Sequence, residues 1–237
     1  MKWVDSDFAL YHHAANTNQE WVDPYQLVEK IVNLHVTDTD SIIVNDFFAG
    51  RTGKFLIIGA NNGMDHSRAL LENGWQGIYC EPDPFAVVEL IKNTDQYKSQ
   101  VNIINAAITD NNYGLQPFYL SLENSACSSL SSEWITAQVT SGGGSQRKVL
   151  TNSISFRSLI EYIGNDFDFI SIDVEGHDID LCESIDWGQF ANLKMILLEA
   201  GPSVLKQLYA QGQFILTDRT PTNAVYIKKD FMLKDTK

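Results

Sequence analysis

Three ionisable side chains, Asp173, Glu175 and His177, follow one short apolar segment, residues 168–172. The run Phe-Ile-Ser-Ile within that segment is typical of a strand buried on both faces. The three side chains therefore end a strand within one turn of each other, where such groups meet a ligand, a metal or a helix terminus. For Asp173 and Glu175 we favour a functional role, whereas Asp178 is expected to cap the helix that follows.

Another acidic group, Glu81, ends a predicted strand at residues 77–80. A carboxylate at that place can accept both hydroxyl hydrogens of an adenosine ribose, although a solvated acid at a strand end is the alternative. The preceding strand, at residues 55–58, runs into a loop of small residues, which let the backbone turn tightly and approach a ligand. That loop consists of Gly59, Ala60, Asn61, Asn62 and Gly63.

The loop departs from the fingerprint of dinucleotide-binding proteins, which places a third glycine three residues after the second. Here Met64, Asp65 and His66 follow Gly63, and the acidic Asp65 near the start of the next helix would repel a pyrophosphate. S-adenosylmethionine has no phosphate, and its charged amino-acid end needs both hydrogen-bond donors and hydrogen-bond acceptors from the protein. The sequence therefore favours an adenosyl cofactor without phosphates.

Short apolar segments alternate with amphipathic ones over most of the chain, which indicates a parallel sheet with helices on both faces. We predict an α/β fold with a Rossmann-like, doubly wound, mostly parallel seven-stranded sheet over residues 51–237. A helical N-terminal lead-in over residues 1–50, with a helix at 24–35, precedes it. The predicted strands are 55–58, 77–80, 101–104, 168–172, 195–198, 214–216 and 224–227; helices are predicted around 68–71, after 82–84, and at 155–163, 179–185 and 203–210.

Residues 111–144 interrupt this alternation. They contain a candidate strand at 117–120, a serine-rich stretch at 121–132 and the beginning of the sequence Ser-Gly-Gly-Gly-Ser at 141–145, which we expect to be a flexible turn. A long polar insertion in a compact domain is often a lid or a binding loop. We therefore expect these residues to form part of a pocket wall.

Charge and cysteine usage exclude several classes of protein. The formal net charge is −13, from 17 Lys and Arg against 30 Asp and Glu, and the basic residues are scattered, so nucleic-acid binding is opposed.

Cys80, Cys127 and Cys182 form no CxxC pair, which indicates buried free thiols in a reducing compartment rather than a zinc site or disulfides. No apolar run suits a membrane span or a signal peptide, so we predict a cytoplasmic protein without a membrane partner. The sequence makes no prediction about the oligomeric state.

Taken together, these segments resemble the FkbM family of class I methyltransferases, which use S-adenosylmethionine. The family's Gly-Ala-Asn-x-Gly loop is similar to residues 59–63, its Glu-Pro-x-x turn to residues 81–84, and its Asp-Val-Glu-Gly-His/Ala-Glu segment to residues 173–178. Weaker similarities lie at 105–108, 128–130 and 198–199, and the likeness covers roughly residues 50–230. The family usually has an acid two residues before the loop's first glycine, which helps to hold the amino-acid part of the cofactor. Ile57 stands there, and Asp65 is a candidate substitute.

The resemblance implies an S-adenosylmethionine-dependent O-methyltransferase acting on a sugar, another polyhydroxylated small molecule or a glycan. Methyl transfer is an in-line displacement, so the enzyme must align an oxygen behind the methyl group and help to remove its proton. Asp173 would lie nearest the methyl group, with Glu175 or His177 as general base. The cofactor would be held by Gly59, Ala60, Asn61, Asn62 and Gly63 at its methionine part, by Glu81 and Pro82 at the ribose, and by Asn105, Ala106 and Ala107 beside the adenine.

Three possibilities stay open. Asp173, Glu175 and Glu199 supply hard oxygens that suit Mg²⁺ or Ca²⁺, and a metal would lower the pKa of a bound hydroxyl, although the spacing does not require one. An NAD(P)-dependent oxidoreductase on a similar sheet would need the missing third glycine and a catalytic Tyr/Lys or His pair. A non-catalytic module that keeps the cofactor fold is consistent with Ile57 in place of the acid.

Overall fold

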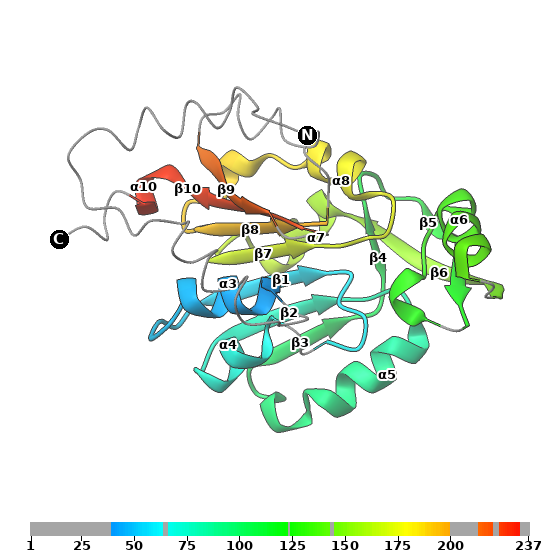
Figure 1. The fold of residues 1–237 in the computed structure, drawn as a ribbon, viewed down its shortest axis with the longest axis horizontal. Helices are drawn as coiled ribbons and strands as arrows, with labels where there is room; N and C mark the ends of the chain where they lie inside the picture. The colour runs from blue at the N-terminus through cyan, green and yellow to red at the C-terminus, as the bar shows by residue number, and fades with distance from the viewer. Residues whose placement is uncertain are drawn as a thin grey trace.

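The computed structural model describes residues 39–63, 66–122, 124–142, 145–199, 213–219 and 223–232. Within these ranges the chain forms a seven-stranded sheet and a separate three-stranded sheet, with helices on both faces of the larger one (Figure 1). This confirms the predicted doubly wound α/β fold. The expected helices at 24–35 and 203–210, as well as Asp65, lie outside the described residues.

The strands of the large sheet, in spatial order, are β3 (Val101–Ile104), β2 (Gln76–Cys80), β1 (Lys54–Ile58), β7 (Phe169–Ile172), β8 (Met195–Leu198), β10 (Ala224–Lys228) and β9 (Phe214–Arg219). Neighbours pair in parallel from β3 to β8, whereas β10 runs antiparallel to both β8 and β9. Every strand predicted for this sheet is present. Its helices are α3 (Thr39–Phe47), α4 (Arg68–Glu72), α5 (Pro84–Asn93), α7 (Phe156–Ile163), α8 (Asp178–Ser184) and α10 (Lys229–Met232), with 3-10 turns η1 (Asp95–Tyr97) and η3 (Trp187–Gln189).

Alternate side chains of the central strands face opposite layers of helices. In β1, Phe55 and Ile57 pack with α3, α4 and α5, whereas Leu56 and Ile58 pack with α7 and α8. This follows from the geometry of a strand, in which successive side chains point to opposite faces. A strand covered on both sides has no polar face, which is why the sequence shows a continuous apolar run there.

The order of the strands reverses between β1 and β7. β2 and β3 continue the sheet on one side of β1, and β7 and β8 extend it on the other. The segments that leave β1 and β7 at their carboxyl ends thus border a crevice, which is where doubly wound sheets bind ligands. Gly59 follows β1 and Asp173 follows β7, and the two backbones touch there: a Cβ added to Gly59 would lie 1.5 Å from the carbonyl oxygen of Asp173.

The described residues between 107 and 155 form a second layer, whereas we expected a long polar insertion with one candidate strand over residues 111–144. β4 (Ala107–Thr109) and β5 (Gly114–Ser121) flank β6 (Gln146–Ser155), and η2 (Ser125–Cys127) and α6 (Ser132–Gly142) lie between β5 and β6 in the sequence. β5 contains the predicted strand at 117–120, but α6 and β6 correct the prediction, and residues 141–142 end α6 instead of forming a flexible turn. Figure 1 shows this layer beside the carboxyl ends of β1, β2 and β3.

Three further findings bear on the predicted organisation and compartment. α3, which lies within the expected N-terminal lead-in, contributes Ile43 and Val44 to the core of the large sheet. Cys80 and Cys182 are buried, Cys127 is partly buried, and all three are free thiols. Within the described part of the chain, every helix is too short or too polar to cross a membrane.

Candidate active site

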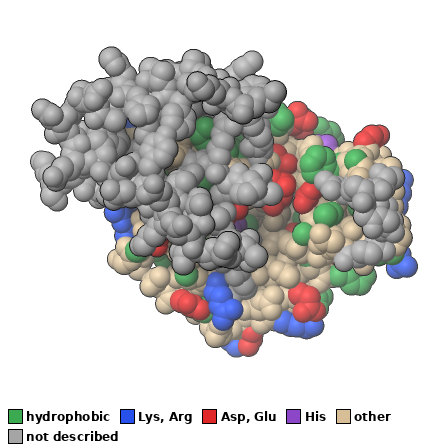
Figure 2. Space-filling view, viewed as in Figure 1, with side chains coloured by type: hydrophobic (Ala, Val, Ile, Leu, Met, Phe, Trp, Pro, Cys, Tyr) green, Lys and Arg blue, Asp and Glu red, His purple; other side chains and the backbone are tan. Residues whose placement is uncertain are grey.

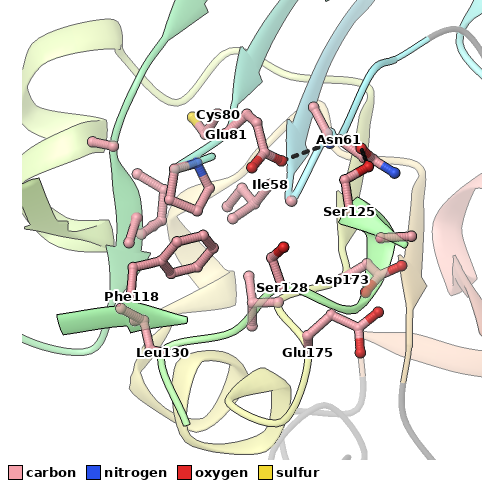
Figure 3. Close-up of a pocket in the computed structure, with 18 of the residues that line it drawn as sticks. Ile58, Asn61, Cys80, Glu81, Phe118, Ser125, Ser128, Leu130, Asp173 and Glu175 are labelled. Carbon is pink, nitrogen blue, oxygen red and sulfur yellow. Dashed lines mark hydrogen bonds between the residues drawn. The ribbon is translucent and has the colours of Figure 1, made fainter. Parts of the chain in front are cut away.

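A cavity of about 180 Å³ opens at the crevice between β1 and β7 (Figure 3). The large sheet contributes the loop after β1, the end of β2, the residue before β4 and the turn after β7. The second layer contributes β4, β5, η2 and the residues that follow η2. The lining residues are Ile58, Gly59, Ala60, Asn61, Asn62, Cys80, Glu81, Pro82, Ala106, Ala107, Ile108, Phe118, Ser125, Ala126, Ser128, Leu130, Asp173, Val174 and Glu175.

Glu81 places a buried carboxylate in the wall of this cavity. Its Oε2 accepts the N–H of Asn61 at 2.6 Å, and its Oε1 accepts the N–H of Asp83 at 2.7 Å. Each oxygen keeps a lone pair, so the carboxylate can also accept the two hydroxyl hydrogens of a ribose. Burial raises the pKa of Glu81 to about 7; the two backbone hydrogen bonds oppose this shift, and the charges of Asp83 and Asp173 add to it.

The loop after β1 uses several of its own amide groups to hold its shape. The N–H groups of Gly59 and Ala60 both donate to the carbonyl oxygen of Cys80, at 2.9 and 3.1 Å, and the N–H of Gly63 donates to Ala60 at 2.8 Å. The loop therefore meets a ligand through small side chains and a close backbone rather than through these N–H groups. Gly63 lies outside the cavity lining and packs against Leu90.

An apolar wall follows β3. Ala106, Ala107 and Ile108 line the cavity together with Phe118 of β5, whose ring faces the open space in Figure 3. A flat apolar wall suits an aromatic base. Phe118 was missed by the sequence reasoning, and the apolar residues at 117–120 were the signal that could have pointed to it.

Two positions singled out in the sequence lie outside the cavity lining. The side-chain amide of Asn105 donates to the carbonyl oxygens of Glu81 and Pro82, at 2.8 and 3.2 Å, so it supports the turn that carries the carboxylate. Ile57, which stands where the family has an acid, is 4 % exposed and packs in the core with α3, α4 and α5. Asp65, the candidate substitute for that acid, lies outside the described residues.

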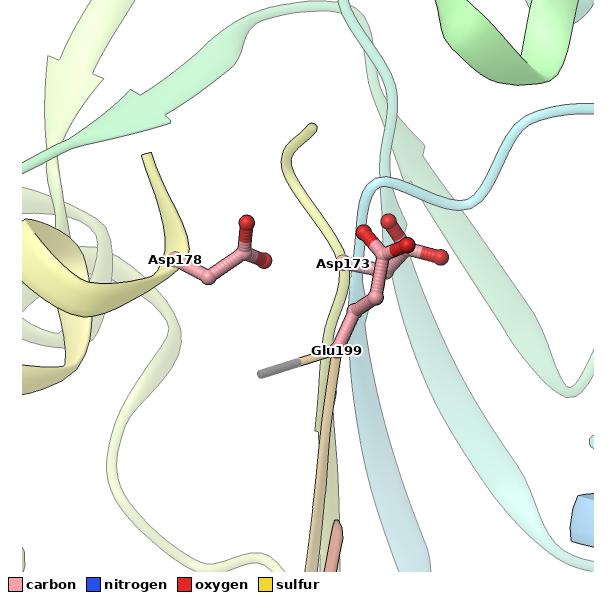
Figure 4. Close-up of side chains that lie close together, drawn as sticks. All are labelled: Asp173, Asp178 and Glu199. Atoms are coloured by element: carbon pink, nitrogen blue, oxygen red, sulfur yellow. The ribbon is translucent and has the colours of Figure 1, made fainter. Parts of the chain in front are cut away.

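Three carboxylates lie where β7 and β8 end and α8 begins, as Figure 4 shows. Oxygen atoms of Asp173, Asp178 and Glu199 lie within 4.8 Å of one another. Burial raises the pKa of Glu199 to about 7, a hydrogen bond with Asp173 opposes this, and the charges of Glu175 and Asp178 add to it. Three hard oxygens so close together could hold a cation. The structure groups Asp178, rather than the predicted Glu175, with the other two candidate metal ligands.

Asp178 also supports the turn after β7. Its two carboxylate oxygens accept the N–H groups of Val174 at 2.8 Å and Gly176 at 3.2 Å. α8 begins at Asp178, and His177 is the residue at its N-cap. Asp178 is therefore not the helix cap that we expected, and its contacts instead fix the turn that presents Glu175.

Glu175 presents its carboxylate to the cavity from a strained backbone. Its φ is 51°, in the left-handed region that residues other than glycine rarely adopt. Its Oε2 accepts the indole N–H of Trp134 at 2.8 Å, and its carbonyl oxygen accepts the hydroxyl of Ser129 at 2.6 Å. Burial raises the pKa of Glu175 to about 7, the charge of Asp173 adds to this, and the hydrogen bond from Trp134 opposes it. Both hydrogen-bond donors come from the second layer, which therefore fixes the position of Glu175.

His177 lies outside this cavity. It lines a neighbouring pocket with Asp110 and Asp180, and Leu130 lines both spaces. Of the three ionisable groups that follow the predicted strand, the structure brings Asp173 and Glu175 to the cavity and places His177 elsewhere.

The cavity is acidic. Glu81, Asp173 and Glu175 line it, and none of its described lining residues is Lys or Arg. On the face seen in Figure 2, Asp and Glu side chains border a central hollow, while Lys and Arg side chains lie toward the edges. Such a cavity favours a cationic ligand such as S-adenosylmethionine and opposes the pyrophosphate of a dinucleotide. This charge argues against the oxidoreductase alternative.

The solved structures that match the chain are distant in sequence. The putative methyltransferase yhhF from Escherichia coli is 11% identical, with a TM-score of 0.47 over 81% of this chain and 87% of that chain. The C-terminal domain of precorrin-6Y C5,15-methyltransferase from Rhodobacter capsulatus is 13% identical, with a TM-score of 0.43 over 82% and 89%. TrmK from M. capricolum, in complex with S-adenosyl-homocysteine, is 8% identical, with a TM-score of 0.42 over 79% and 65%.

The family comparison is more direct. No curated protein matches the chain. The model of the methyltransferase FkbM domain matches residues 58–216, a range that includes the loop after β1, Glu81 and the turn after β7. The chain therefore belongs to the FkbM methyltransferase family and is an S-adenosylmethionine-dependent methyltransferase.

Proposed function

We propose that the protein transfers the methyl group of S-adenosylmethionine to a hydroxyl oxygen of a sugar or another polyhydroxylated small molecule. The proposal rests mainly on one observation: two carboxylates face the same cavity from opposite sides (Figure 3). Glu81 is buried and suited to bind a ribose, and Glu175 lies across from it, near Asp173. The acceptor class comes from the resemblance to the FkbM family. The choice of an oxygen nucleophile agrees with a carboxylate base at the reacting end.

The cofactor supplies an electrophilic methyl group on a positively charged sulfur. Glu81 would bind the ribose hydroxyls, and the apolar wall that contains Ala107 and Phe118 would hold the adenine. Asp173 offers a negative charge to the cationic part, next to the loop after β1. Leu130 and η2 would exclude water from the other side.

Glu175 is the residue that we assign to removing the proton of the acceptor hydroxyl. Trp134 holds its Oε2, which leaves Oε1 to accept the proton. The bond from Ser129 to its carbonyl oxygen orients the backbone before the acceptor arrives, so little positioning is left to do during the reaction. His177, the other predicted base, does not line the cavity.

Transfer of tritium-labelled methyl groups to a panel of neutral glycans tests this proposal. We expect label in an ether linkage that is stable to mild base, and transfer at least about a hundredfold slower with Glu175→Gln. Glu183→Gln, an exposed change on α8, is the matched control and should keep full activity. Label in an ester or an amine, or undiminished transfer by Glu175→Gln, would contradict the proposal.

The proposal includes Mg²⁺ as an auxiliary ion. Asp173, Asp178 and Glu199 offer the hard oxygens that Mg²⁺ prefers, and the ion would lower the pKa of an acceptor hydroxyl. Neutralising three clustered carboxylates would also stabilise the fold. At a free Mg²⁺ concentration one hundred times the Kd, the Tm of the protein should be about 5 °C higher than in EDTA. The substitution Glu199→Gln should remove this increase. A wild-type Tm that Mg²⁺ leaves unchanged would remove the ion from the proposal.

Cofactor binding should depend on pH through Glu81. Burial raises the pKa of Glu81 from 4.5 to about 7. In the ligand-free protein, the contribution of Glu81 to the free energy of unfolding is therefore present below about pH 4.5 and is lost as the pH rises through 7. Ribose hydroxyls donate hydrogen bonds and therefore favour the ionised form. We expect S-adenosylhomocysteine to bind roughly tenfold more tightly at pH 8 than at pH 6, as measured by calorimetry. A flat profile would show that Glu81 does not accept from the ribose.

A further inference from the structure

A second pocket, of about 240 Å³, lies beside the cofactor cavity. It is bounded by residues at the end of β4 and in β5 on one side and by the start of α8 on the other. Leu130, labelled in Figure 3, lines both spaces, so the two pockets are neighbours. The polar lining of the second pocket consists of Asp110, Tyr113, Gln116, His177 and Asp180, with Thr109.

Within the described part of the chain, one buried group in the wall of this pocket lacks a hydrogen-bond partner. Nε2 of Gln116 is shielded from solvent and has no hydrogen-bond partner within the described residues. Leaving a buried amide unsatisfied is unfavourable, and native proteins rarely keep one without a reason. Gln116 lines the pocket, so a ligand oxygen there would supply the missing acceptor once the amide turned toward the open space. His177, half-buried in the facing wall, can donate or accept a further hydrogen bond.

The charge of the pocket limits what it can bind. Asp110 and Asp180 place exposed carboxylates in its wall, and none of its described lining residues is Lys or Arg. Asp110 also accepts the hydroxyl of Tyr113 at 3.0 Å, which extends the polar side of the pocket. Carboxylates attract hydrogen-bond donors and cations and repel anions. Leu130 and Leu181 supply an apolar surface for the carbon side of a ring.

We propose that this pocket binds the part of the acceptor that is not methylated, and that it takes a group rich in hydrogen-bond donors, neutral or cationic, but not an anion. His177 is then a binding residue for the acceptor. The bound group lies on one side of Leu130 and the methyl donor on the other. The role in methyl transfer rests on the proposed function, whereas the class of ligand does not and can be tested without any transfer.

Three sugars with the same ring test the class of ligand: glucosamine, glucose and glucuronate carry a positive charge, no charge and a negative charge. Each is titrated into the whole chain while NMR follows the imidazole signal of His177, assigned by its loss in His177→Gln. We expect saturable shifts with glucosamine and glucose, with glucosamine binding at least as tightly, and no shift with glucuronate. Glucuronate binding as well as glucose, or no shift with any of the three, would overturn the proposal.

Asp180→Asn tests the location. It should weaken glucosamine binding about fivefold and affect glucose binding less, because one carboxylate is removed. Asp95→Asn, an exposed change in η1 outside both pockets, is the matched control and should change neither. Equal effects of the two variants would overturn the assignment to this pocket. Sugars that bind as expected but are never methylated would count against the proposed function and leave the ligand class intact.

Discussion

Replacing Gly59 with alanine should destabilise the protein by about 4 kcal/mol or more, one of the largest losses that a single substitution causes. Gly59 has a φ of 80°, which costs an alanine about 1 kcal/mol. The larger part comes from contact, since the new Cβ would lie 1.5 Å from the carbonyl oxygen of Asp173 and 2.7 Å from its carbon. Both backbones leave strands that pair directly, β1 with β7, so neither can move away without disturbing the sheet. Urea denaturation measures the loss.

Gly74→Ala is the matched control for this prediction. Gly74 has a similar φ of 84°, and no atom lies within 4 Å of the place where its Cβ would be. The change should therefore cost only about 1 kcal/mol, from the backbone alone. The difference between the two variants measures how tightly the loop after β1 packs on the turn after β7. Equal losses would mean that the crevice between these strand ends is wider than the structure has it.

The large sheet could be predicted because its central strands are buried on both faces. Four consecutive apolar residues in β1 and in β8 are recognisable without knowing what covers them. β6 gives no such signal, since the side chains that it buries include Thr151, Ser153 and Ser155, while Leu150 is 66 % exposed. In β6, therefore, several polar side chains are buried and an apolar one is exposed, which is the reverse of the usual pattern. α6 is similarly hidden, because its buried Ile135 stands in a sequence rich in Ser and Thr.

The candidate site could be predicted where its residues follow strand ends. Glu81 occupies such a position, and the parallel strands bring it to the same edge of the sheet as the turn after β7. Phe118 and Trp134 could not be found in this way, because they belong to the second layer and reach the site only through the fold. His177 was expected beside Glu175, but proximity in the sequence does not fix direction in a tight turn, and its side chain lines another pocket.

Glu81→Gln should weaken the binding of S-adenosylhomocysteine by roughly 100-fold, because two charge-assisted hydrogen bonds to the ribose are lost or weakened. Glutamine keeps the size of the side chain but has a single acceptor oxygen. Its NH₂ group would face the backbone N–H of either Asn61 or Asp83, both of which donate to the carboxylate in the wild type. Calorimetry measures the affinity. Glu89→Gln, an exposed change on α5, should leave it unchanged.

The loss in Glu81→Gln could come from the ribose contact or from a displaced loop, and a ligand without one hydroxyl separates the two causes. In the wild type, removing the 2′-hydroxyl of S-adenosylhomocysteine should weaken binding about tenfold, because one hydrogen bond to Glu81 disappears. If Glu81 binds the ribose, the same deletion should cost the Gln variant little, since the two changes remove the same interaction. If Glu81 acts only by holding the N–H of Asn61, the two losses should add. In that case the ribose would lie elsewhere in the cavity, and Glu175 would lose its assigned place beside the methyl group, although the family membership of the chain would stand.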